Sequence, residues 1–185
     1  MQVNVFNQLI NHYMPQYNRH YDFAELNGML KGFIDLTFVF DGKYYVADYK
    51  SNHLGYDYKD YQLAELERAM QHHDYHLQAI LYTLALHRWL GQQLADYDYE
   101  KHIGGAYYLF LRGMHSNKAG NGVYYFKAPQ AFILALDDLF DGRNDVELMA
   151  GSALKATPND AKAKSKAEPN DNVKDQDDKG QLNLW

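Results

Sequence analysis

Two strand-like runs of apolar and aromatic residues lie next to each other, at residues 32–40 and 43–50. Runs rich in β-branched and aromatic residues are typical of β-strands. Asp41 and Gly42 join them, and this dipeptide favours a two-residue type I′ turn because both turn positions need a positive φ. The pattern therefore predicts an antiparallel hairpin whose register is fixed by its turn.

Other parts of the chain show the period of an α-helix. Pro15 ends the first helical segment, and Asp74 is a candidate N-cap between the second and the third. Apolar residues recur with helical spacing at residues 1–14, 60–73, 74–90 and 129–140.

Two further strands are predicted in the second half of the chain. Residues 103–112 form a near-continuous apolar run, which predicts a central strand covered on both faces. Residues 123–127 predict a short last strand. Together with the helical segments, this order predicts an α/β fold with a mixed central sheet flanked by helices.

The register of the predicted hairpin places Asp35 opposite Asp48, with Lys50 two residues further on the same face. Directly opposed residues hold their Cβ atoms about 4.5–5.5 Å apart, so two carboxylates repel each other there. Mg²⁺ compensates for this, because it prefers one or two carboxylates and keeps water or phosphate oxygens in its other positions. A neighbouring lysine can stabilise charge on a phosphate or help to orient water. These two aspartates and the lysine are therefore suited to metal-assisted phosphodiester hydrolysis. The alternative interpretation is that Lys50 only forms an ion pair with Asp48.

The sequences GFID at residues 32–35 and DYKS at residues 48–51 resemble the PD-(D/E)xK nuclease pattern. Over residues 28–142 the chain is similar to the C-terminal nuclease domain of RecB-type subunits of exonuclease V. The resemblance implies a restriction-endonuclease-like domain at residues 1–142. We expect this domain to be truncated at its N-terminus, because the family also uses a histidine ligand from a helix far upstream. Ile34 stands where the usual proline precedes the first aspartate.

Site roles follow from this resemblance for four residues of the hairpin. Asp35, Asp48 and the backbone carbonyl of Tyr49 would bind Mg²⁺, with Mn²⁺ or Ca²⁺ able to substitute in binding. Lys50 would be the catalytic lysine, acting with Asp35 and Asp48. The implied activity is that of a Mg²⁺-dependent exodeoxyribonuclease in DNA repair and recombination.

Gln78 and Tyr82 match the Q-x-x-x-Y motif associated with this nuclease group, and the resemblance implies that they contact DNA. Four residues apart on a helix, they share a face, which also suits a plain pair packed against the hairpin. The implied partners are DNA, the RecC and RecD subunits and the recombinase RecA. An alternative function is a catalytically inactive interaction module that docks such partners.

The amino-acid composition limits the kinds of binding and chemistry that the chain can support. The formal net charge of −6 argues against broad electrostatic binding to nucleic acid, which ordinarily needs a basic face. The chain has no cysteine, which excludes disulfides and thiolate chemistry. No apolar run has the length of a membrane span and no secretion signal begins the chain, so we expect a cytoplasmic protein without membrane contact.

A histidine cluster offers a second metal site. His72 and His76 have the i, i+4 spacing at which two imidazoles bind zinc, but no acidic residue follows His72 directly as H-E-x-x-H requires. We interpret the cluster, which includes His73 and His87, as surface residues.

The amino-acid composition of the chain changes toward the C-terminus. Residues 151–180 contain no aromatic residue and few large aliphatic ones, so they cannot bury enough apolar surface to fold. We predict a disordered linker at residues 143–180 and a docking peptide at residues 181–185. The peptide resembles the sliding-clamp-binding sequence Q-L-x-L-F and also suits packing on its own domain; its side chains are Gln181, Leu182, Leu184 and, in place of phenylalanine, Trp185.

Overall fold

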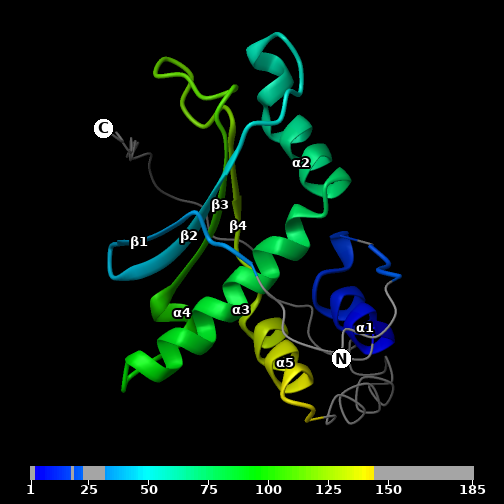
Figure 1. Ribbon diagram of the computed structural model, residues 1–185, viewed down its shortest axis with the longest axis vertical. Helices are drawn as coiled ribbons and strands as arrows, with labels where there is room; N and C mark the ends of the chain where they lie inside the picture. Colours follow the sequence, from blue (N-terminus) through cyan, green and yellow to red (C-terminus); the bar gives the residue numbers. More distant parts are fainter. Residues whose placement is uncertain (1–2, 18, 23–31, 144–185) are drawn as a thin grey trace, which may run out of the picture.

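The computed structural model describes residues 3–17, 19–22 and 32–143. Its centre is a four-stranded sheet with the strand order β1-β2-β3-β4 (Figure 1). β1 and β2 are antiparallel, β2 and β3 are parallel, and β3 and β4 are antiparallel, which confirms a mixed sheet. The strands are β1 (Leu36–Phe40), β2 (Lys43–Lys50), β3 (Ile103–Phe110) and β4 (Val123–Phe126).

Helices complete the α/β fold and agree with the four predicted segments to within a few residues. A short helix that leads into β3 and two 3₁₀ turns were not predicted. The helices are α1 (Val3–Tyr13), α2 (Leu63–His72), α3 (Tyr75–Gln93), α4 (Tyr99–His102) and α5 (Gln130–Phe140), and the 3₁₀ turns are η1 (Pro15–Tyr17) and η2 (Tyr58–Tyr61).

The hairpin has the predicted register. Phe40 pairs with Lys43, and Asp41 and Gly42 have φ angles of 49° and 71°, as a type I′ turn requires. The first strand is shorter than predicted, because it begins at Leu36 and not at residue 32. The reason lies in the side chain of Asp35, whose carboxylate accepts the backbone N–H of Tyr49 and so takes a donor that would extend the ladder.

The described helices lie on one face of the sheet, where they enclose the core (Figure 1). β3 is an interior strand, as predicted, and each of its eight residues is buried or half-buried, although the described helices cover only one of its faces. On its other face the rings of Phe38, Tyr45, Tyr107 and Tyr125 form a row across all four strands. Neighbouring centroids in this row are 5.0–5.8 Å apart, so ring contacts take the place of a second helical layer.

The break between the second and third helices falls at His73 and Asp74, as predicted. Asp74 is the N-cap residue of α3, as predicted, but its φ is 55° and its side chain makes no capping hydrogen bond. The carboxylate instead lies 2.7 Å from the guanidinium of Arg19, outside α3. The Asp74 side chain therefore lies against Arg19 and does not accept a hydrogen bond from the first turn of α3.

His76 is buried, so its interpretation as a surface residue is wrong, whereas His72 and His73 are exposed. The Nε2 atom of His76 lies 3.0 Å from the Tyr124 hydroxyl, and the ring packs on Tyr17. His72 and His76 therefore do not share a zinc site.

No helix in the described part of the chain is long and apolar enough to cross a membrane. The predicted linker and docking peptide lie outside the described residues, apart from Arg143 at the start of the linker.

Burial makes His76 a source of acid sensitivity. Burial lowers the pKa of His76, and the nearby Glu67 and Asp74 only partly oppose this. The unfolded chain, with a histidine pKa of about 6.5, therefore binds more protons than the folded one as the pH falls. We expect the free energy of unfolding, measured with urea between pH 7 and pH 5, to decrease less in His76→Gln than in the wild type. His72→Gln is the exposed control, and an unchanged slope in His76→Gln would contradict the assignment.

Candidate active site

The candidate site lies at the C-terminal end of β2, on the face that α3 covers. Asp48 and Lys50 alternate along the strand, so both side chains point toward the helical layer. They are 6% and 9% exposed, and the Lys50 Nζ lies 2.6 Å from Asp48 Oδ2. Charges removed from water are tolerated when they are paired and hydrogen-bonded, so each of these groups depends on the other.

Three further groups hold the ammonium of Lys50. It donates a hydrogen bond of 2.9 Å to Gln78 Oε1 on α3. It also lies 3.8 Å from the centroid of the Tyr75 ring and 5.1 Å from that of Tyr108, at distances where the negative face of a ring attracts a cation. Lys50 is therefore fixed in position by a carboxylate, an amide and two aromatic rings.

Asp35 lies just before β1, beyond the last paired residues, Leu36 and Ala47. Continued by one step, the same register sets Asp35 against Asp48, and the carboxylate of Asp35 accepts the Tyr49 N–H at 3.0 Å. The structure thus brings the two predicted acids to the same end of the hairpin. The predicted role of the Tyr49 carbonyl as a metal ligand stays a prediction.

Tyr82 gives a second indication that the two acids lie together. Burial raises the pKa of the Tyr82 phenol, and the charges of Asp48 and Asp35 both raise it further against the opposing effect of Gln78. The hydroxyl donates a short hydrogen bond to the carbonyl of Phe33. The ring also explains a glycine in the GFID sequence, because a Cβ on Gly32 would lie 3.0 Å from Tyr82 Cε1.

Gln78 connects these groups through both ends of its amide. Its Oε1 accepts from Lys50 and, at 3.2 Å, from the Tyr108 hydroxyl, while its Nε2 donates to the Tyr82 hydroxyl at 2.9 Å. Gln78 and Tyr82 therefore share a face, as predicted, and contact the site. Their expected contact with DNA stays a prediction.

Sequence reasoning missed two aromatic residues of the site, Tyr75 and Tyr108. Tyr108 is the partner of Asp48 in the parallel pairing of β2 with β3. That pairing joins segments about 60 residues apart and leaves no signal in either segment. Burial raises the pKa of the Tyr108 phenol and the charge of Asp48 raises it further, so the hydroxyl remains a hydrogen-bond donor.

The two carboxylates fit a hard divalent cation better than a closed metal cage. No group of three or more histidine, cysteine, aspartate or glutamate side chains suited to a metal occurs among the described residues. Asp35 and Asp48 each engage Oδ2, and in the described part of the chain no hydrogen-bond donor contacts Oδ1 of either. Mg²⁺ is commonly held by one or two carboxylates and several waters, which these oxygens could provide.

Together, the fold and the site define an α/β domain with two carboxylates and a buried lysine at the end of a hairpin. The chain is similar to the RecB subunit of the RecBCD enzyme of Escherichia coli, with 50% identity over 121 residues, or 65% of the chain. It is 41% identical to RecB of Haemophilus influenzae over 75% of the chain and 45% identical to RecB of Mycobacterium tuberculosis over 63%. The matched part of the chain is homologous to a segment of these subunits.

The similarity covers a small part of those proteins. The matched segment spans only 10% of the Escherichia coli subunit and 11% of the Haemophilus influenzae subunit. No protein-family profile matches the chain.

Gln78 is expected to stabilise the site before any ligand binds. Gln78→Ala removes the acceptor of both Lys50 and Tyr108, and leaving buried donors unsatisfied costs about 1–3 kcal/mol. We expect the free energy of unfolding in urea to fall by that amount. Gln92→Ala, at an exposed position of the same helix, is the control. Equal losses in the two variants would show that the amide network has no special role.

Proposed function

We propose that this chain provides the nuclease site of a RecBCD-type enzyme and hydrolyses phosphodiester bonds of DNA in repair and recombination. One observation carries the proposal: the buried ammonium of Lys50 is held between Asp48 and Gln78, at the end of the hairpin where Asp35 also lies. Similarity to RecB subunits supports it, because their name assigns them to an enzyme. The resemblance of residues 32–35 and 48–51 to the PD-(D/E)xK nuclease pattern supports it as well.

In this proposal the acids bind the metal. Asp35 and Asp48 would hold Mg²⁺ through carboxylate oxygens, the carbonyl of Tyr49 would add a further ligand, and Mn²⁺ or Ca²⁺ could replace Mg²⁺ in binding. When bound, the ion would supply positive charge to a phosphate oxygen and lower the pKa of a coordinated water.

The protein groups orient the substrate and the attacking water. Lys50 can donate to a phosphate oxygen or to water, because an ammonium has three donors and two of them already point to Asp48 and Gln78. A donor held in place before the reaction costs no reorganisation when charge builds up on the phosphate. Gln78 and Tyr82 would keep Lys50 in place and form the side of the site that meets the DNA strand.

The proposed partners follow from the same similarity. The chain would work with the RecC and RecD subunits of a RecBCD-type enzyme and with DNA. Contacts with the recombinase RecA and with the sliding clamp remain proposals from the sequence, the latter through residues 181–185.

Metal binding can be tested without substrate. We expect calorimetric titration with Mg²⁺ or Mn²⁺ to show binding by the wild type and a loss of at least about 10-fold in affinity in Asp48→Asn and in Asp35→Asn, because each change removes a charged ligand. Asp41→Asn is a matched control. Asparagine tolerates the positive φ of that turn position, and the turn lies at the opposite end of the hairpin from the site. Undiminished affinity in Asp48→Asn would refute the metal site.

Cleavage tests the lysine. We expect Lys50→Ala to slow Mg²⁺-dependent cleavage of single-stranded DNA by at least about 100-fold, the usual loss when one preorganised donor to a developing charge is removed. Lys43→Ala is the control at the other end of β2, where Nζ donates to the Glu100 carbonyl. An unchanged rate in folded Lys50→Ala would exclude the mechanism, and a wild-type chain that binds Mg²⁺ without cutting DNA would favour the interaction module.

A further inference from the structure

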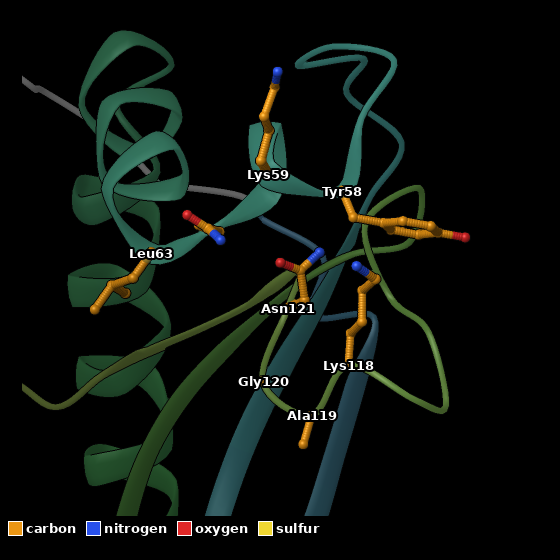
Figure 2. A pocket seen from close by; sticks show the side chains of 8 residues that line it. Tyr58, Lys59, Leu63, Lys118, Ala119, Gly120 and Asn121 are labelled. Carbon is orange, nitrogen blue, oxygen red and sulfur yellow. The ribbon is translucent and has the colours of Figure 1, made fainter.

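A pocket of about 510 Å³ lies between one wall, formed by η2 and the start of α2, and a second wall, formed by the loop that joins β3 to β4. Figure 2 shows Lys118 and Asn121 pointing toward η2, with Lys118 beside Tyr58, while Lys59 projects from η2 away from the loop. Its principal lining residues are Tyr58, Lys59 and Leu63 on one wall and Lys118, Gly120 and Asn121 on the other.

The charge of the pocket is opposite to that of the chain. The formal net charge of the chain is −6, yet the lining residues include two lysines and no acidic residue. Among the described residues, no carboxylate lies within ion-pair distance of Lys118, whose Nζ lies 4.9 Å from the centroid of the Tyr58 ring. Lys59 is 3.2 Å from Asp57, but both side chains are about 70% exposed, so this pair is weak and a phosphate can replace it.

Tyr58 gives the pocket an aromatic surface. It is 40% exposed, and its ring meets His115 at a centroid distance of 5.2 Å, which holds it in place. Asn121 adds a polar group on the opposite wall, where Nδ2 donates to the Gly113 carbonyl and the side-chain oxygen remains an acceptor. A cationic groove with an exposed ring suits a single-stranded nucleic acid, since lysines hold phosphates and every base has a face that stacks on tyrosine.

Both walls are tied to the strand that carries the candidate site. The N–H of Gly122 donates to the carbonyl of Tyr61 at 3.0 Å, which links the loop to η2. The Tyr61 hydroxyl contacts the backbone of Asn52, two residues after Lys50, and the N–H of Leu111 donates to the Lys50 carbonyl. The pocket is therefore fixed relative to the end of β2.

We propose that this pocket binds a segment of single-stranded DNA, with phosphates on Lys59 and Lys118 and a base stacked on Tyr58, and so leads the strand to the end of β2. The role as a path to the site rests on the proposed nuclease function, whereas binding by the pocket does not. The local charge also explains how a chain of acidic composition can hold a polyanion.

Binding is measured by fluorescence anisotropy with a labelled thymidine 12-mer in EDTA, so that cleavage plays no part. We expect Lys118→Gln to weaken binding about 10-fold at low salt and to reduce the salt slope by about 1, because one phosphate contact is lost. We expect Tyr58→Ala to weaken binding about 5- to 150-fold, the usual effect of losing one stacked base, and Tyr58→Phe to restore it. Lys101→Gln, at an exposed lysine outside the pocket, should bind like the wild type.

Circular dichroism confirms that each variant is folded. No binding by the wild type, or equal binding by the wild type, Lys118→Gln and Tyr58→Ala, overturns the proposal. A polyglutamate peptide that binds as tightly as the 12-mer also overturns it, because the pocket would then recognise acidic protein. If cleavage depends on Lys50 but the pocket variants bind like the wild type, only the pocket proposal is refuted. If the pocket variants bind more weakly but cleavage does not depend on Lys50, only the proposed nuclease site is refuted.

Discussion

The buried ion pair between Lys50 and Asp48 is the interaction on which the site depends. Burying the Lys50 ammonium between the sheet and α3 costs solvation free energy, and its contacts with Asp48, Gln78 and two tyrosine rings offset this cost. This requirement explains why α3 presents an amide, and not an apolar side chain, at this point of its buried face. The same contacts fix the position of the ammonium, as its proposed contact with a phosphate requires.

Local signals in the sequence were enough for the hairpin and its acids. Asp41 and Gly42 set the turn, the turn set the register, and the register brought Asp35 and Asp48 to one end, because each step involves residues close in sequence. Contacts between side chains from segments far apart in the sequence could not be predicted. Tyr108 joins the site through a parallel pairing with β3, and His76 is buried by neighbours that its own helix does not reveal.

The proposed metal site and the pocket differ in the groups that the chain contributes to each. Asp35 and Asp48 provide few ligands of their own, which suits an ion that keeps most of its water. The pocket gathers two lysines where the chain as a whole is acidic, so any attraction for a polyanion is local and acts over about one Debye length, roughly 8–10 Å at moderate salt. If the pocket binds a strand as proposed, its lysines would select the position of the strand but would attract it little from a distance.

β1 is the edge strand of the sheet, and four of its five residues are exposed. Among the described strands it neighbours β2 alone, so transient separation of these two strands needs far less free energy than unfolding of the core. Asp35 precedes this strand, whereas Asp48 and Lys50 belong to the interior strand that would stay in place. One acid can thus leave and rejoin the other while the domain remains intact, and amide hydrogen exchange in β1 would report how often it does so.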